Sequence, residues 1–180
     1  MSREGAAVND PVHFSAPLQL RDGRQIEIRA QRPEDSDEFE LAVSRKSDES
    51  LYRRFFSVKR RFSKDEAAKF LDIDFVNHVA LVAVAIEAGD PNIVGAGRYI
   101  VAKPGQAEVA FAIIDKYQGQ GIGGALMRHL ATLAQAAGLK ELTAEVLAGN
   151  ASMLNVFRRS GLPMQTRSER EVVHVSMSLA

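Results

Sequence analysis

A run of glycines, Tyr117 to Gly124 with the sequence YQGQGIGG, lies between the apolar segment VAFAII (109–114) and a helical pattern that opens with ALMRHLATLAQAA. A glycine in a helix costs about 1 kcal/mol relative to alanine, so this many glycines at a helix start need a reason. Successive main-chain N–H groups at a helix N-terminus form a site for a diphosphate. The stretch therefore predicts a strand, a phosphate-binding loop and a helix in direct succession.

The same glycines fit other patterns. Gly119-x-Gly121-x-x-Gly124 matches the dinucleotide fingerprint, and Glu145 follows at about the distance, ~20 residues, where an acid binds the ribose. That fold needs successive βαβ units, whereas the segments before the loop predict an antiparallel meander. No Lys-Ser or Lys-Thr follows Gly124, which excludes a P-loop. A tight turn without a ligand stays open, although it needs fewer glycines.

Strand-length apolar segments precede the loop at 79–86, 93–102 and 107–114. They are partly β-branched, and short connections with Gly or Pro join them, which predicts the meander. Further upstream, Asp22-Gly23 between alternating apolar residues predicts a hairpin over 18–30. Three helices are expected between 33 and 71, the third one starting at a Ser63-Lys64-Asp65-Glu66 capping box.

Beyond the loop, helix and strand patterns alternate. A helical stripe begins at Ile122 and ends at Gly138, which suits a C′ glycine. The strand that follows is expected to run parallel to 107–114, because a helix connects the two. The remaining expected elements are that strand at 139–147, a helix over 151–160 capped by Asn150 and closed by Gly161, and a last strand, VVHVSMSL.

Composition narrows the classes of partner. The chain has 180 residues with 46% hydrophobic residues, and 23 basic residues balance 23 acidic ones, so neither nucleic acid nor an anionic membrane is expected as a partner. The basic stretch RRFFSVKRRF (53–62) is interpreted as a packed element with a basic outer face. The absence of cysteine excludes disulfides, thiolate metal sites and an acyl-enzyme on a thiol.

The domain organisation is expected to be simple. Residues 1–17 lack the apolar core of a signal peptide and are expected to form a polar N-terminal arm, with a single domain over 18–180. No stretch approaches the roughly 18 apolar residues of a membrane span. A cytoplasmic location is the expectation that fits these features.

The segment FAIIDKYQGQGIGGALMRHL, with GNASMLNVFRRSGL after the next strand, resembles the acetyl-CoA-binding core of the GNAT family of N-acetyltransferases. The family signature reads here as Gln118-x-x-Gly121-x-Gly123, and the resemblance covers 79–162. Upstream, RPEDSDEF and SDESLYRRFFSVKRRFS resemble the N-terminal half of the bacterial Pat-type protein lysine acetyltransferase domains. The resemblance implies an α/β single-domain GNAT fold, with a mixed central sheet of an antiparallel meander plus a parallel strand pair, flanked by helices.

Acetyl-CoA, as the acyl-donor substrate, is the ligand that this resemblance implies, and no metal is expected. The main chain of Ala112, Ile113 and Ile114 would pair with the pantetheine amides like an added strand. Asn150, Met153 and Phe157 would line the other side of the ligand. The residues implied to hold the diphosphate through main-chain N–H groups are Gln118, Gly119, Gln120, Gly121, Ile122, Gly123 and Gly124.

Acetyl transfer to an amine needs a base, because a lysine amine with a pKa near 10.4 is mostly protonated at neutral pH. Glu108 begins the strand before the loop and alternates with Ala107 and Val109, so its carboxylate lies on the opposite face. The matching glutamate is the general base of Pat-type domains, which implies that role for Glu108. A solvated edge-strand glutamate is the alternative.

The resemblance also shows a departure. Many GNAT enzymes have a tyrosine in the last helix that protonates the departing thiolate, whereas the segment here reads FRRSGL and has Phe157 at that position. Pat-type domains lack this tyrosine too, and a thiolate is a tolerable leaving group without an acid. The resemblance further implies an oxyanion-binding N–H near Ile113, at a strand bulge of the family. His78, His129 and His174 show no carboxylate partner in the sequence.

The function implied is acetyl transfer from acetyl-CoA directly to a primary amine, with a protein lysine as the favoured acceptor. A small-molecule amine acceptor and a non-catalytic module that senses acyl-CoA are the alternatives, and an NAD-type binder is a third. The sequence leaves the identity of the acceptor, the acyl-chain preference and a homodimeric assembly open.

Overall fold

The computed structural model describes residues 10–35 and 73–180 of the chain. The helices expected between 33 and 71 fall almost entirely outside these residues, as do the stretch 53–62 and the start of the expected arm. The elements of the described part are β1 (Ser15–Gln19), β2 (Gln25–Ala30), β3 (His78–Glu87), β4 (Asp90–Lys103), β5 (Gln106–Ile113), the 3-10 helix η1 (Asp115–Tyr117), α4 (Ile122–Ala136), β6 (Glu141–Leu147), α5 (Ala151–Arg158), β7 (Met164–Glu169) and β8 (Val172–Ser178).

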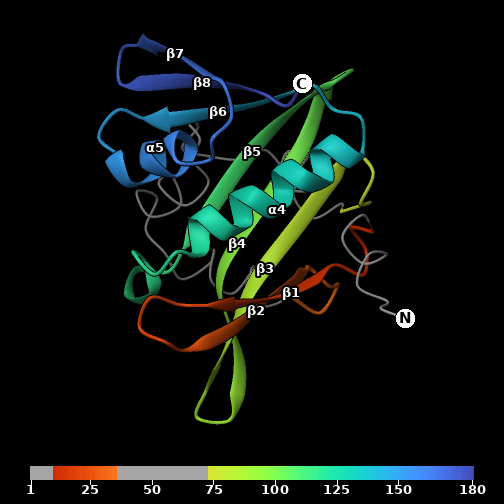
Figure 1. The fold of residues 1–180 in the computed structure, drawn as a ribbon, viewed down its shortest axis with the longest axis vertical. Helices are drawn as coiled ribbons and strands as arrows, with labels where there is room; N and C mark the ends of the chain where they lie inside the picture. Colours follow the sequence, from red (N-terminus) through yellow and green to blue (C-terminus); the bar gives the residue numbers. More distant parts are fainter. Residues whose placement is uncertain (1–9, 36–72) are drawn as a thin grey trace.

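The strands of this described part form one mixed sheet of eight, in the order β1-β2-β3-β4-β5-β6-β8-β7 (Figure 1). Every neighbouring pair is antiparallel except β5 and β6, which run parallel. The hairpin, the meander and the parallel pair that the sequence predicts are all confirmed. The parallel pair is short, because β5 and β6 are in register only over Gln106–Glu108 and Glu141–Thr143.

The first hairpin starts earlier than expected. Gly23 supplies the positive φ of the turn, at 93°, and β1 already begins at Ser15. Phe14 is buried, and its ring centroid lies 4.8 Å from that of His129 in α4. The end of the segment expected as a polar arm, 1–17, therefore belongs to the sheet and the core.

Helix α4 packs across β3, β4 and β5 on one face of the sheet (Figure 1). Its apolar stripe is buried, as the helical spacing predicts. At its end the Leu139 N–H donates to the Ala134 carbonyl and the Gly138 N–H to the Gln135 carbonyl, both at 3.0 Å, with Gly138 at φ 83°. This is the glycine C-cap expected at Gly138.

The C-terminal part contains one strand more than the sequence analysis predicts. Asn150 caps α5 as expected, and α5 ends at Arg158, slightly before the predicted end. The expected last strand is β8, but β7 precedes it and pairs with it along the whole of Met164–Glu169. β7 forms the outer edge of this side of the sheet, and most of its side chains are exposed.

Candidate active site

The glycine loop joins η1 to α4 and leaves a row of main-chain donors without acceptors. Gly119 and Gly121 have φ values of 75° and 96°, which a residue with a Cβ rarely adopts. The first helical hydrogen bond of α4 runs from the Ala125 N–H to the Gly121 carbonyl, and no side chain caps the helix. In the described part of the chain, the N–H groups from Gly121 to Gly124 are thus available, and such a row attracts an anion.

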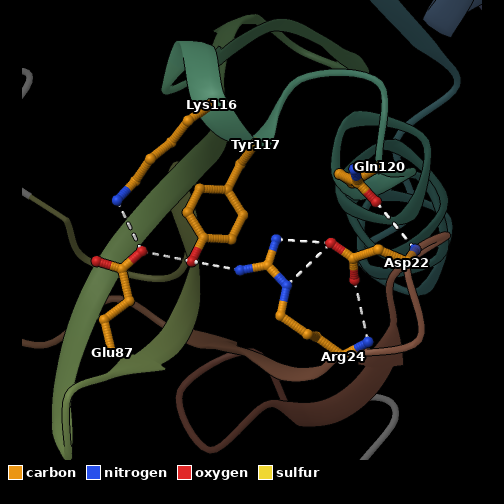
Figure 2. A network of polar contacts seen from close by, with 6 residues as sticks. All are labelled: Asp22, Arg24, Glu87, Lys116, Tyr117 and Gln120. Carbon is orange, nitrogen blue, oxygen red and sulfur yellow. Dashed lines mark hydrogen bonds and ion pairs between the residues drawn. The ribbon is translucent and has the colours of Figure 1, made fainter.

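Two glutamines of the loop use their side chains to hold its backbone. Gln118 Nε2 donates to the Ile113 carbonyl at 3.2 Å and to Asp115 Oδ1 at 3.3 Å. Gln120 Oε1 accepts from the main-chain N–H of Asp22 in the first hairpin, at 3.2 Å (Figure 2). These contacts occupy both side chains, which leaves the main-chain N–H groups at the start of α4 as the unpaired donors of the loop among the described residues.

β5 has one edge that faces away from β4. The Ile114 N–H donates to the Val94 carbonyl at 3.1 Å, and the Ile114 carbonyl accepts from the Tyr117 N–H at 3.0 Å. Main-chain groups alternate in direction along a strand, so those of Ala112 also point to β4, whereas those of Ile113 point to the other side. Of the three residues expected to pair with a ligand amide, Ile113 has the suitable direction.

This open edge exists because β5 and β6 separate. β6 continues to pair with β8 as far as Leu147, but its register with β5 ends at Thr143, opposite Glu108. Among the described residues, no strand pairs with the β6-facing edge of β5 beyond Glu108, and the contact made there is that of Gln118 Nε2 with the Ile113 carbonyl. A ligand with amide groups can add to such an edge in the manner of a strand.

The bulge implied near Ile113 is not present in the pairing of β4 with β5. The register runs without a shift from Gly95 opposite Ile113 to Val101 opposite Ala107. An irregularity lies instead between β3 and β4, where Ala83 pairs with Gly95 and Val84 with Ile93. The extra residue there, Val94, is the one whose carbonyl binds the Ile114 N–H.

Helix α5 borders the loop on the other side. The Asn150 Oδ1 accepts from the Met153 N–H at 3.2 Å, so this oxygen serves as the helix cap. Met153 and Phe157 are both buried, and the Phe157 ring centroid lies 6.0 Å from that of Phe111 in β5. The α5 helix approaches α4 closely at Gly123, where a Cβ would lie 3.2 Å from Val156 Cγ2.

Glu108 lies on the face of the sheet opposite α4, and its side chain is exposed. Together with β6, β7 and β8 it borders a hollow of about 320 Å³. The polar side chains on this surface come from consecutive strands in register, with Glu108 beside Thr143, and Thr143 beside Ser176. Glu108 is thus the last β5 residue paired with β6, at the point where the strands separate.

His174 acquires partners that the sequence analysis misses. Its Nδ1 lies 3.5 Å from Glu145 Oε1 on β6, and its Nε2 lies 3.4 Å from Glu169 Oε2 on β7. Arg167, opposite His174, lies 3.7 Å from the same Glu169 carboxylate. The cross-strand register brings these groups together, so recognising β7 in the sequence would have revealed them. Glu145, the acid considered for a ribose, faces His174 instead.

The hydroxyl of Tyr117, which precedes the glycines of the loop, has two partners among the described residues. It donates to Glu87 Oε1 at 2.6 Å and accepts from Arg24 Nη1 at 3.1 Å (Figure 2).

The described residues contain no group of three or more potential metal ligands, and no helix among them is long and apolar enough to cross a membrane.

Comparison with known proteins agrees with this geometry. The model of the acetyltransferase (GNAT) family matches residues 47–162. An acetyltransferase from Pseudomonas aeruginosa is 34% identical over 135 residues, which cover 74% of this chain and 73% of that protein. The acetyltransferase Pat of Mycolicibacterium smegmatis is 32% identical over 149 residues, but these cover 81% of this chain and only 43% of Pat.

A solved structure shows the same fold. The crystal structure of the GNAT domain of S. lividans PAT matches with a TM-score of 0.74 and 32% identity, covering 91% of this chain and 96% of that domain. The sheet, the loop and these matches define the class of protein. The chain belongs to the GNAT acetyltransferase family.

Proposed function

We propose that this acetyltransferase transfers the acetyl group of acetyl-CoA directly to a primary amine, and that a protein lysine side chain is the favoured acceptor. The observation that carries the proposal is the position of Glu108, at the point where β5 leaves β6 and its open edge begins. The carboxylate, the strand edge and the amide row of the loop lie along one continuous segment, from Glu108 to Gly124.

In the proposed complex, the N–H groups from Gly121 to Gly124 bind the diphosphate of the donor. The main chain of Ile113 and the preceding open edge of β5 bind the pantetheine amides. This arrangement directs the thioester toward the start of the open edge, near Glu108. The side chains of Asn150, Met153 and Phe157 on α5 would border the donor; the buried Phe157 ring would supply apolar contact and no proton.

The chemistry assigned to Glu108 is removal of the proton from the protonated acceptor amine, directly or through one water. The freed nitrogen lone pair then forms the C–N bond at the thioester carbonyl. Ile113 lies five residues, roughly 16 Å, along β5 from Glu108. A main-chain N–H of the open edge closer to Glu108 is therefore the group proposed to stabilise the oxyanion. The C–S bond breaks as the carbonyl re-forms, the new amide nitrogen gives up its second proton to solvent, and the departing CoA thiolate takes a proton from solvent.

A protein acceptor is favoured over a small amine by the surface around Glu108. The side chains that border the hollow from β7, Gln165, Thr166 and Arg167, are exposed. A small-molecule site usually encloses most of its ligand, whereas a long side chain presented by a protein needs only an open depression. The resemblance of the N-terminal half to Pat-type protein lysine acetyltransferase domains favours the same acceptor class.

The test is release of CoA thiol from acetyl-CoA, measured with lysine-bearing proteins and with small primary amines. Release by the wild type is expected to depend on an acceptor and to be highest with protein acceptors. The Glu108→Gln variant is expected to lower the rate at least about tenfold, within the range of a general base, while acetyl-CoA still binds. Glu171→Gln, which changes an exposed glutamate in the β7–β8 turn, is the matched control.

Two results would contradict this proposal. If Glu108→Gln is as active as Glu171→Gln, another group removes the proton. If acetyl-CoA binds but no acceptor releases thiol, the alternative of a non-catalytic module that senses acyl-CoA takes precedence.

A further inference from the structure

The glycine loop is attached at two places to the turn of the β1–β2 hairpin, which is distant in sequence. Tyr117 precedes the loop, and its hydroxyl accepts from Arg24 Nη1 at 3.1 Å. Arg24 in turn binds Asp22, with Nη2 at 2.7 Å and Nε at 2.9 Å from Oδ2. The Asp22 N–H then donates to Gln120, inside the loop. Figure 2 shows that these contacts run from Tyr117, directly before the loop, through Arg24 and Asp22 to Gln120 inside it.

Glu87, at the end of β3, ties the same hydroxyl to the central sheet. Its Oε1 accepts from the Tyr117 hydroxyl at 2.6 Å and lies 2.8 Å from Lys116 Nζ. The Arg24 guanidinium also lies over the Tyr117 ring, 4.8 Å from its centroid. Tyr117 is 1% exposed, so its ring is fixed by packing while its hydroxyl is held from both sides. We call Tyr117, Arg24, Asp22, Glu87 and Gln120 the loop anchor.

The protonation states of Tyr117 and Glu87 favour the hydrogen bond between them at neutral pH. The hydrogen bond to Glu87 raises the pKa of Tyr117, so the phenol remains a neutral donor at neutral pH. The hydrogen bonds from Lys116 and Tyr117 lower the pKa of Glu87, so it remains an anionic acceptor. Hydrogen bonds between a neutral and a charged group are stronger than those between neutral groups.

A loop rich in glycine loses much conformational freedom when a ligand orders it, and this loss weakens binding. The loop anchor restricts the backbone on both sides of Gly119 before any ligand arrives. We propose that Tyr117, acting through its hydroxyl and the hairpin turn, is a positioning residue that holds the amide row of the loop in its diphosphate-binding conformation. This inference rests on the proposed function, because it assigns the bound anion to the donor.

In the part of the chain that the structure describes, no member of the anchor borders the hollow beside Glu108. Loss of the anchor should therefore weaken binding of the donor and leave the chemical step nearly intact. For Tyr117→Phe, which keeps the ring and removes the hydroxyl, KM for acetyl-CoA is expected to rise about tenfold, with a much smaller change in kcat. A general loss of folded enzyme would instead lower kcat in proportion and leave KM unchanged.

Tyr99 provides a matched control. It is also 1% exposed, but it lies in β4, away from the loop, so Tyr99→Phe should leave KM for acetyl-CoA unchanged. A second pair tests the hydroxyl's partner: Glu87→Gln keeps an acceptor oxygen and should retain most of the affinity, whereas Glu87→Ala should raise KM like Tyr117→Phe. Binding of acetyl-CoA by calorimetry gives the same comparison without turnover.

The outcomes separate the two proposals. If the wild type neither binds acetyl-CoA nor releases thiol, the proposed function fails, and the assignment of the anchor to the donor fails with it. If the wild type turns over and KM is the same for Tyr117→Phe and Tyr99→Phe, the anchoring role alone is contradicted. A shift in KM for Tyr117→Phe that Glu87→Ala reproduces and Glu87→Gln does not confirms it.

Discussion

At the scale of single residues, the most buried ion pair of the described chain joins Arg29 on β2 to Asp35. Arg29 Nη1 and Nη2 donate to the two carboxylate oxygens of Asp35, at 2.8 and 3.0 Å. The main-chain N–H of Arg32 donates a third hydrogen bond to this carboxylate, at 2.7 Å. Burial alone would raise the pKa of Asp35, but the bonds from Arg29 and Arg32 outweigh it and the pKa is lowered. The pair fixes the chain where it leaves β2.

Replacing Asp35 with Asn should cost about 3 kcal/mol at neutral pH, because it leaves the buried guanidinium without its counter-charge. A lowered pKa stabilises the folded state above the ordinary carboxyl pKa, and this contribution is lost as the pH falls through the folded-state value. The difference between wild type and variant should therefore persist down to about pH 4 and shrink below it.

Urea unfolding at several pH values measures this difference. Asp90→Asn, at the exposed first residue of β4, is the control and should show almost no effect. A difference for Asp35→Asn that grows on acidification would contradict the assignment of the charge to the native pair.

The residues of the site differ in how far the sequence predicts them. Gly138 and Asn150 are predictable because a helix cap selects a residue type locally. The direction of the Ile113 and Ile114 main-chain groups is not, because it depends on which β4 residue lies opposite. For the same reason the partners of His174 depend on a register that no local pattern contains.

At the scale of elements, the contact between α4 and β4 depends on glycines in the strand. A Cβ added at Gly97 would lie 2.8 Å from Phe111 Cδ1 and 3.1 Å from Leu130 Cδ1. Gly95 is similarly close to side-chain atoms of Ile113 and Ile122. The missing side chains let α4 lie near the sheet, and this places its N-terminus beside the end of β5.

Gly97→Ala should lower the free energy of unfolding by about 1–3 kcal/mol, the usual cost of overpacking a tight core. Gly149→Ala is the matched control, since its Cβ would meet no atom within 4 Å and its φ is not positive. Thermal or denaturant unfolding of the two variants gives the comparison. Equal stability of both would show that α4 moves to accept the methyl group.

β7 shows why one element escaped prediction. Its sequence, MQTRSE, has no alternation of apolar and polar residues, and most of its side chains are exposed. An edge strand with few buried side chains is held by main-chain hydrogen bonds to its neighbour, here β8. Hydrophobic periodicity reports burial, so it detects β3 and β5 but not a strand of this kind.

At the scale of the whole molecule, the sheet has two parts that meet over a short parallel contact between β5 and β6. The donor site proposed here spans this junction and is formed by the folded state alone. Acetyl-CoA should therefore stabilise the protein against heat: at a concentration 100 times its Kd the gain is about 2.7 kcal/mol, or several degrees in Tm.

NAD at the same concentration is the matched control ligand. It carries a diphosphate but no pantetheine, so it can use the amide row but not the open edge of β5. Thermal unfolding with each ligand separates the two contributions. Equal protection by NAD and acetyl-CoA would contradict the assignment of the β5 edge to the donor.

The composition of the whole chain excludes thiol chemistry and indicates that the chain is large enough for a core. It carries no information about where β5 and β6 separate. That separation follows from the length of the β5–β6 register, which ends at Glu108 and Thr143. The sequence indicated a parallel pair through the intervening helix, and only the structure shows that the pairing stops so soon.

The open edge of β5 also bears on the speed of recognition. A ligand that adds to it breaks no hydrogen bond between the described strands, so no opening of the sheet has to precede the encounter. Association would then be limited by diffusion and alignment, at about 10⁵–10⁷ M⁻¹ s⁻¹. Differences in affinity among acyl donors would then come mainly from differences in their dissociation rates.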